Sequence, residues 1–528
     1  MKYDHSQGAK RAFVFFAVSL LSGFMADTGV AQQLTPGESD NPPAVPAQEQ
    51  PEVLNRGPVH EAFAEPVNLQ YGTGMVAPER PPPNIEETPP DEKPKGQQFV
   101  WIPGYWSWDA DRSGYIWVSA CWRVAPPRMS WVPGYWSQVS SGWEWIAGFW
   151  TPANDQEIEY LPAPPTIGDV EPNSPAPSPD TLWVPPCMYW VQGQYVRRSG
   201  YWLAGQSNWV WVPAHYVGTP RGYIFAAGHW DYALERRGVL FAPVFFASGG
   251  YRSHGFTFSP SIVVDIGLLR LSLFACPRYS HYYFGDYYDD VYLNIGIFPW
   301  FGIHRDRTWY DPVYEHARWS NRRSEPRWEA HGREDYDRRR ADSNLRPART
   351  YREQESRMAK LPEAQRRSMQ VTKPIMTLAA RRDAPMKFER MTTESRDTIK
   401  KQSTAVHTFG NDRNRWESTT TSQRKSASPT SERKQSVVSP IGEHRETVQP
   451  ARERKATVTA PAVQREAVVS PARENRTKQP ERVQIPTSPI VGESGRGGFF
   501  QRGLPAQPSD EGKDKEGRDL HRGKGYSR

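Results

Sequence analysis

WIPGYW at Trp101–Trp106, WVPGYW at Trp131–Trp136 and WIAGFW at Trp145–Trp150 are three close copies of one aromatic hexapeptide. A short repeat of this kind usually sets the architecture of the whole segment in which it recurs. Successive copies begin 14 or 16 residues apart, except for one step of 38 residues. The first positions of the nine copies are Trp101, Trp117, Trp131, Trp145, Trp183, Arg197, Trp211, Phe225 and Phe241. We therefore assign residues 97–246 to one repeat domain.

Each copy has the composition of a β-strand. Trp, Tyr, Val and Ile dominate between turns that contain glycine, such as Gly114 and Gly142, and these residue types favour strands and tight hairpins. The third position alternates between Pro and a small residue, and Pro cannot donate to a β-ladder. The alternation indicates a repeating unit of two strands and about 28 residues. The sequence predicts an all-β fold, an antiparallel β-meander of about nine short Trp-rich strands arranged as two sheets or a barrel.

The N-terminus has the features of an export signal. Lys10 and Arg11 precede an apolar run, Ala12–Ala26, and a small-x-small cleavage site ends at Ala31. A membrane anchor is the alternative, but the run is shorter than the ~18 residues that a spanning helix needs. We expect a cleaved signal peptide at 1–31, export to the periplasm, outer envelope or extracellular space, and no transmembrane helix after cleavage.

Composition divides the remainder of the chain. Residues 32–96 are a Pro-rich stretch predicted to be a disordered linker, in which the apolar island His60–Val67 could dock as a strap. A Pro-rich insertion occupies 152–181, and a Tyr-rich segment at 247–320 is predicted to extend the β-structure. Residues 321–528 contain 45 Lys and Arg against 28 Asp and Glu, whereas the preceding part contains 21 against 31. This basic, low-complexity tail is predicted to be disordered.

The aromatic ladder is the candidate ligand-binding surface, because Trp and Tyr rings stack on the apolar faces of sugars. The competing interpretation is that these rings are the core, since each aromatic side chain can bury ~150–250 Å². Positions one and six point to opposite faces of a regular strand, so one set can be buried while the other is exposed. We expect most Trp side chains in the core and a binding face made by the remainder. The candidates are Trp101, Tyr105, Trp106, Trp131, Tyr135, Trp136, Trp145, Trp150, Trp202 and Trp211.

The two cysteines Cys121 and Cys187 both occupy the fifth position of their hexapeptide. Because an exported protein meets an oxidising environment, we predict a disulfide between them. The alternative, given equal weight, is that each fills a small core site, because a bond requires Cα atoms within ~7 Å.

Motifs for metal binding or catalysis are weak. Asp286, Asp289 and Asp290, with His281 nearby, could offer oxygen ligands to Ca²⁺, but their spacing matches no EF-hand-like loop. The chain has no HExxH motif, GxSxG elbow or P-loop. We predict no metal, no cofactor and no enzymatic activity.

The hexapeptide copies WIPGYW, WVPGYW and WIAGFW resemble those of the bacterial YXWGXW (WxxGxW) repeat proteins, a family of exported chains. The copies at Trp117, Trp183 and Arg197 depart from the pattern at the glycine or at an aromatic position. The resemblance covers less than a third of the chain. It implies export and a repeat architecture, and it brings no activity, catalytic residue or cofactor.

Together these features predict an exported structural or binding module of the cell envelope. The aromatic domain would bind cell-wall polysaccharide or another envelope component, and the basic tail would contact anionic polymers or surfaces. Self-association is compatible with the sequence, and export argues against nucleic acid as a partner. The alternative is a secreted carbohydrate-active hydrolase with an unrecognised carboxylate pair.

Overall fold

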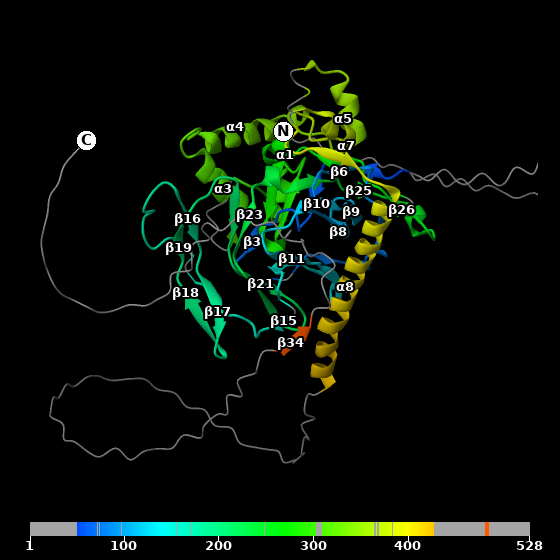
Figure 1. Ribbon diagram of the computed structural model, residues 1–528. Coiled ribbons are helices and arrows are strands. Elements are labelled where there is room, and N and C mark those ends of the chain that lie inside the picture. The colour runs from blue at the N-terminus through cyan, green and yellow to red at the C-terminus, as the bar shows by residue number, and fades with distance from the viewer. Residues whose placement is uncertain are drawn as a thin grey trace, which may run out of the picture. The chain divides into compact units, whose positions relative to one another are not determined.

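The computed structural model describes residues 50–426 and 481–484, with gaps at 71, 73, 97, 156, 169, 248, 302–308, 364–365, 367–368 and 383. The predicted signal peptide lies outside these residues. The described chain is largely β, as expected, with several helices in its C-terminal part (Figure 1). Its strands form many small sheets, nearly all antiparallel, and no closed barrel is present among the described residues.

Two consecutive hexapeptide copies form one antiparallel hairpin of about 28 residues. In the first hairpin Trp106 pairs with Trp117, and Trp101 pairs with Trp122. Both arms are interrupted at the third and fourth hexapeptide positions, so each hairpin consists of four short strands rather than two long ones. The first hairpin comprises β7(Phe99–Ile102), β8(Tyr105–Asp109), β9(Gly114–Val118) and β10(Cys121–Val124), and the second comprises β11(Met129–Val132), β12(Tyr135–Val139), β13(Gly142–Ile146) and β14(Phe149–Pro152).

The third and fourth hairpins have the same plan. The third comprises β16(Thr181–Val184), β17(Cys187–Val191), β18(Gln194–Arg198) and β19(Tyr201–Ala204), and the fourth comprises β20(Trp209–Val212), β21(His215–Gly218), β22(Tyr223–Ala226) and β23(His229–Tyr232). The paired registers confirm the 28-residue unit that the alternating prolines indicate. The strands pair within these units instead of running through one continuous nine-stranded meander.

The first two hairpins are widened by other parts of the chain. The ninth copy forms β24(Gly238–Leu240) and β25(Val244–Phe245), which pair with β10 and β9. In addition, β1(Glu52–Val53) pairs with β25, and β4(Val76–Ala77) pairs with β13. The Pro-rich insertion contains β15(Glu157–Tyr160), whose partner is β34(Glu481–Gln484). Strands far apart in sequence therefore complete the sheets that the repeats begin.

The segment predicted to be a disordered linker is structured from residue 50 onward. Val59 and Phe63 are fully buried, and so is Asn55, which shows that the apolar island lies inside the domain as a strap would. The prediction of disorder from composition fails here because a Pro-rich segment can still be buried between hairpins that satisfy its polar groups. Besides β1 and β4, this segment contains β2(Gly57–Pro58), β3(Val67–Asn68), β5(Glu86–Glu87) and β6(Glu92–Pro94). Residues 32–49 lie outside the described part.

The Tyr-rich segment contributes the four-stranded sheet β2-β29-β28-β30 and a core around Tyr282 and Phe284, which are fully buried. Its elements are β26(Thr257–Phe258), β27(Ile262–Val264), α1(Ile266–Leu269), β28(Leu273–Cys276), β29(His281–Phe284), α2(Asp290–Asn294), β30(Phe298–Pro299) and β31(Trp309–Tyr310). Short 3-10 helices lie at η1(Leu234–Arg236), η2(Gly249–Arg252), η3(Arg270–Ser272), η4(Pro277–Tyr279) and η5(Ser343–Leu345).

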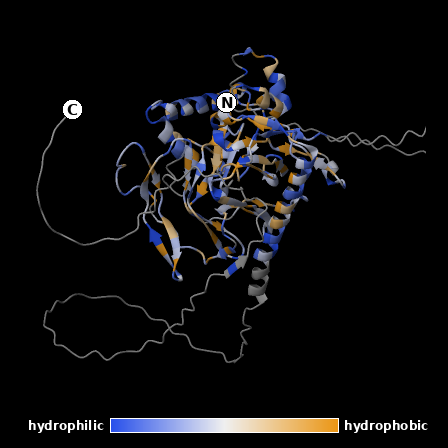
Figure 2. Cartoon of the chain, viewed as in Figure 1, coloured by the Kyte–Doolittle hydropathy of each residue, from blue (hydrophilic) through white to orange (hydrophobic). Residues whose placement is uncertain are grey.

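The prediction that the tail is disordered from residue 321 is wrong as far as Ser426. This part contains α3(Pro312–Asn321), α4(Trp328–Ala341), α5(Tyr351–Met358), β32(Thr372–Pro374), α7(Ile375–Ala380), β33(Phe388–Arg390) and α8(Thr393–Ser426). Figure 2 shows why composition misled, because α4 is coloured mainly hydrophilic. Helix α8 is also polar, yet it buries Val406 and Phe409 together with the charged pair Arg413 and Glu417. Residues 427–480 and 485–528 lie outside the described part, and no described helix has the length and apolarity to cross a membrane.

Candidate functional site

The hexapeptide pattern is explained by aromatic pairs across each hairpin. Trp101 and Trp122 meet edge to face with ring centroids 5.1 Å apart and an interplanar angle of 67°, and Trp106 and Trp117 meet at 5.1 Å and 77°. Edge-to-face contact is a favoured geometry for aromatic rings. The same pairing recurs at Trp131–Trp150, Trp136–Trp145, Trp183–Trp202 and Trp211–Trp230. Positions one and six are therefore aromatic because they contact each other edge to face across the hairpin.

The glycine at position four makes room for the indole of the paired copy. A Cβ added at Gly148 would lie 2.4 Å from Cζ2 of Trp131, and one added at Gly134 would lie 2.5 Å from Cζ2 of Trp145. Atoms cannot approach so closely without a shift of the ring or the backbone. The spacing of the tryptophans and the glycine in WxxGxW thus follows from one local packing geometry.

Each hairpin has a break in its ladder at positions three and four of its two copies. In the second hairpin the break consists of Pro133-Gly134 on one arm and Ala147-Gly148 on the other. The N–H and C=O of one trans peptide point in opposite directions. The position-four N–H groups therefore lie on one side, here named the amide face, and the position-three carbonyls lie on the other, here named the carbonyl face.

Glu87 fills the amide face of the first hairpin. Its Oε2 accepts a hydrogen bond from the Gly104 N–H at 2.7 Å, and its Oε1 accepts from the indole of Trp117 at 2.8 Å and from the Ala120 N–H at 3.2 Å. Glu87 is fully buried, and burial raises its pKa to about 7, although the three donors oppose the rise. One carboxylate thus binds both position-four amides and a position-one indole.

Glu61 fills the amide face of the second hairpin in the same way. It accepts from the indole of Trp145 at 3.1 Å and from the Gly148 N–H at 3.2 Å, and the Gly134 N–H also bonds to it. Burial raises the pKa of Glu61 to about 7. Two hairpins therefore use equivalent donors to hold a buried glutamate from the N-terminal segment.

The carbonyl faces receive donors from elsewhere in the chain. In the second hairpin, Nη1 of Arg413 on α8 donates to Pro133 O at 3.0 Å and to Ala147 O at 3.1 Å. The Arg413 guanidinium is held in turn by Glu417, whose Oε1 accepts from its Nε at 2.8 Å. In the first hairpin, Nε2 of His60 donates to Pro103 O at 3.1 Å. The neighbours His60 and Glu61 thus join the carbonyl face of the first hairpin to the amide face of the second.

We expect the stability contributed by Glu61 and Glu87 to fall as the pH rises from about 4.5 to 7, whereas buried histidines with lowered pKa values, such as His60, act in the opposite direction. In this window the unfolded chain has released the protons of Glu61 and Glu87, while the folded protein retains them because their pKa values are raised to about 7. The contribution of each carboxyl to the unfolding free energy must then fall with pH, by on the order of 3 kcal/mol. Urea unfolding of wild type and Glu87→Gln at pH 5 and pH 8 isolates the contribution of Glu87, because the stability of wild type relative to the variant should be lower at pH 8 than at pH 5. An equal pH dependence in wild type and Glu87→Gln would contradict this prediction.

Most predicted ligand-binding residues belong to the core. Eight of the ten are only 2–8% exposed, and these eight cannot form an accessible aromatic ladder because their rings fill the hairpin interiors. The remaining two, Trp202 and Trp211, are half-buried. The eight are Trp101, Tyr105, Trp106, Trp131, Tyr135, Trp136, Trp145 and Trp150. The glutamates and the arginine that fill the breaks were not predicted, because no local motif marks them.

The predicted disulfide between Cys121 and Cys187 is not formed. Both residues are buried free thiols, as is Cys276. Cys121 packs in the cluster around the first hairpin and the Tyr-rich sheet, whereas Cys187 packs with Met188 and Tyr216 in another cluster. The two positions are equivalent within their hexapeptides, but the first and third hairpins do not pair with each other. Both cysteines instead agree with the alternative prediction, in which each fills a small site in the core.

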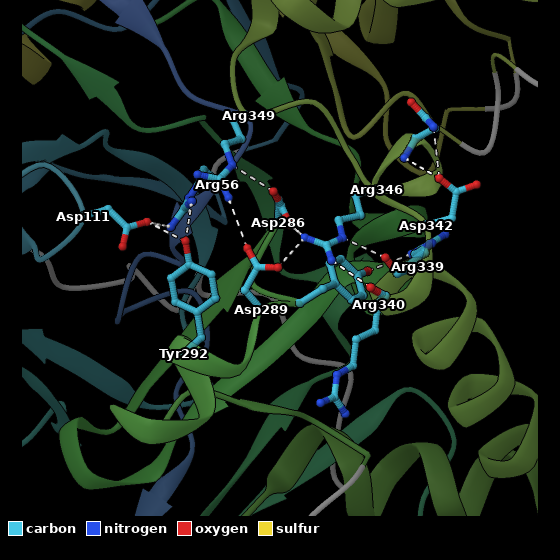
Figure 3. Close-up of polar contacts among 12 residues, drawn as sticks. Arg56, Asp111, Asp286, Asp289, Tyr292, Arg339, Arg340, Asp342, Arg346 and Arg349 are labelled. Atoms are coloured by element: carbon cyan, nitrogen blue, oxygen red, sulfur yellow. Dashed lines mark hydrogen bonds and ion pairs between the residues drawn. The ribbon is translucent and has the colours of Figure 1, made fainter. Parts of the chain in front are cut away.

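The acidic residues considered as Ca²⁺ ligands are bound by arginines. Arg349 Nε donates to Asp286 at 2.8 Å, and Arg346 Nη1 donates to Asp289 at 2.8 Å (Figure 3). Nearby, Arg56 pairs with Asp111 at 2.6 Å. Among the described residues, no group of three or more His, Cys, Asp or Glu side chains could hold a metal ion. The Arg349 and Arg346 contacts attach the tail to the Tyr-rich segment, and the Arg56 contact attaches the N-terminal segment to the first hairpin.

A cavity of about 70 Å³ lies between the N-terminal segment and the fourth hairpin, and its lining includes Glu65, Gln70, His215 and Arg278. Burial raises the pKa of Glu65 well above its usual range and lowers that of His215 to about 4. Small-molecule pockets usually measure ~300–1,000 Å³. This cavity therefore gives no support to the hydrolase alternative.

No protein-family model, curated protein or solved structure matches this chain.

Proposed function

We propose that this chain is an exported WxxGxW-type repeat protein of the cell envelope, and that its third hairpin binds an anionic wall polysaccharide. The supporting observation is the exposure of this hairpin. Val191, Val196 and Tyr201 are 40%, 41% and 47% exposed, and Tyr201 is the only aromatic residue among the exposed large hydrophobic side chains of the described chain. Figure 1 shows β17 and β18 at one side of the molecule. We therefore propose that the expected binding face, made by aromatic residues outside the core, is the surface of the third hairpin.

The sequence of the third hairpin departs from the repeat in a way that suits a polymer-binding surface. Arg197 replaces the usual aromatic residue at position one, and it is exposed together with Arg198. The Arg198 guanidinium lies 4.1 Å from the ring centroid of Tyr189. This is a cation–π contact, in which the ring attracts the positive charge. Aromatic rings can stack on sugars, while a guanidinium group binds a carboxylate or phosphate through two parallel hydrogen bonds. One hairpin can therefore offer groups that recognise both parts of an acidic glycan.

Titration of the mature protein with purified acidic wall glycan, followed by Trp fluorescence, tests this function. We expect saturable binding without release of reducing ends, and a loss of roughly tenfold or more in affinity for Tyr201→Ala, as for an interface hot spot. The matched control is Leu271→Ala, which removes a side chain of similar exposure, 45%, from another surface. Equal affinities of the two variants would place the binding face elsewhere, and released reducing ends would favour the hydrolase.

The basic tail remains the second proposed contact. Its residues 427–480 and 485–528, which lie outside the described part, carry 18 Lys and Arg against 12 Asp and Glu, and we propose that they bind anionic envelope surfaces by charge attraction. Such binding weakens as salt rises. Glycan binding by the third hairpin should be less sensitive to salt, because stacking contributes to it.

A further inference from the structure

We propose that the amide face of the fourth hairpin binds the carboxylate of a glutamate side chain from a partner polypeptide. The break of this hairpin consists of Pro213-Ala214 and Ala227-Gly228. The inference concerns a different hairpin and a different ligand from the proposed glycan site, and it does not depend on that function.

The fourth hairpin has the geometry of the second. Val212 pairs with His229 and His215 with Ala226, as Val132 pairs with Phe149 and Tyr135 with Ile146. A Cβ on Gly228 would lie 3.1 Å from the nitrogen of Ala214, and in the second hairpin the corresponding distance from Gly134 to the nitrogen of Gly148 is 2.9 Å. The two position-four amides thus approach each other in both hairpins, and in the second hairpin both bind Glu61.

The carbonyl face of the fourth hairpin is satisfied by its own side chains. His215 and His229 occupy position five on the two arms. Nδ1 of His215 lies 3.0 Å from Pro213 O, and Nδ1 of His229 lies 3.0 Å from Ala227 O. A carbonyl oxygen only accepts, so each Nδ1 carries the proton. The two imidazoles perform the role that Arg413 performs in the second hairpin.

The amide face of the fourth hairpin has no corresponding acid. No side chain of the described residues accepts a hydrogen bond from the N–H of Ala214 or Gly228, although Glu87 and Glu61 accept from the equivalent donors of the first two hairpins. Gly228 is half-buried whereas Ala214 is buried, so solvent reaches this break on its Gly228 arm. The third hairpin cannot offer the same pair of donors, because Pro186 occupies position four on one arm and has no N–H.

The two filled breaks indicate the chemistry of the ligand. In both, the acid is a glutamate of the N-terminal segment: Glu87 belongs to the short strand β5, and Glu61 lies in a turn at residues 61–63. Hydrogen bonds from N–H groups to an ionised carboxylate are about twice as strong as neutral ones. A polypeptide that presents a Glu side chain is therefore the ligand that this geometry is built to receive.

The probe is the peptide PVHEAFA with an amidated C-terminus, which copies Pro58–Ala64 and carries a single acid, Glu61. Its matched control has Gln in place of that glutamate. Hydrogen–deuterium exchange of the full chain is measured with each peptide. We expect the glutamate peptide to slow exchange at residues 212–216 and 226–230, and the glutamine peptide to have little effect.

Two variants test the donors. Ala214→Pro removes one N–H and recreates the WVPP sequence that the chain already contains at Trp183–Pro186, whereas Ala214→Gly retains the N–H. We expect Ala214→Pro to weaken peptide binding by roughly tenfold or more, as for a lost hydrogen bond to a charged group, and Ala214→Gly to bind like wild type.

The absence of glutamate-dependent protection in the wild-type chain would overturn the proposal even if Ala214→Pro failed to fold. Equal binding by the two variants would also overturn it. Glucuronate serves as a third probe, and its binding in place of the peptide would assign the site to an acidic sugar and exclude the polypeptide. Loss of glycan binding in Tyr201→Ala with intact peptide binding would separate this site from the third hairpin.

Discussion

Replacement of Arg413 by Ala is expected to lower the unfolding free energy by about 3–5 kcal/mol, the usual cost of removing one partner from a buried ion pair. Arg413 and Glu417 are both fully buried, and Arg413 also donates to the Pro133 and Ala147 carbonyls. Its loss leaves Glu417 as an uncompensated buried charge and leaves the carbonyl face of the second hairpin without its donor. Urea unfolding measures the change, and limited proteolysis should cut α8 more rapidly in the variant.

The control for this experiment is Arg415→Ala. Arg415 lies on the same helix, but its side chain is 76% exposed and its ion pair with Asp412 is at the surface. Such substitutions usually change stability by no more than about 0.5 kcal/mol. If Arg413→Ala and Arg415→Ala were equally stable, α8 would not be docked on the second hairpin.

The second large effect is expected at the position-four glycines. Gly148→Ala should destabilise the protein by roughly 3 kcal/mol, because the new methyl group would collide with the buried Trp131 ring and with the Val132 carbonyl oxygen, 2.4 and 2.7 Å away. At Gly228 the nearest ring atom, on Trp211, lies at 3.0 Å. Gly228→Ala should therefore cost less than half as much as Gly148→Ala.

Thermal unfolding of the series tests the order of these effects. Gly168→Ala is the control, because no atom lies within 4 Å of its added Cβ, and a replacement that the backbone tolerates usually stabilises slightly. We expect the melting temperature to be highest for Gly168→Ala, lower for Gly228→Ala and lowest for Gly148→Ala. A Gly148→Ala protein as stable as the control would show that the glycine has no steric role in the motif.

The repeat part of the fold was predictable because its information is local. The alternation of Pro103, Ser119, Pro133 and Ala147 indicates a two-copy unit, and the structure pairs these copies into hairpins. Strand pairing within 28 residues needs little knowledge of the rest of the chain. How the hairpins are assembled was not predictable, since the aromatic pattern is nearly the same in all of them.

The segments on both sides of the repeats were misjudged for a physical reason. Composition treats each charged residue as solvated, yet Glu61, Glu87 and Arg413 are buried on hairpin breaks. The Arg413 contact to Pro133 spans 280 residues, and no sequence spacing shows which peptide groups it will meet. The candidate site was missed for the same reason, because its donors are backbone groups that any sequence possesses.

The ties between the two ends of the described chain determine when folding can finish. Asn55 binds Gln354 at 3.1 Å, Gln354 in turn donates to the carbonyl of Thr372 at 2.8 Å, and Arg413 reaches back to the second hairpin. Contacts between residues so distant in sequence slow folding. A chain still being synthesised can form its early hairpins, but the carbonyl face of the second hairpin lacks its donor until α8 has emerged. The native state is thus closed by α8, the last helix of the described part, and a nascent chain stays open until synthesis has passed Ser426.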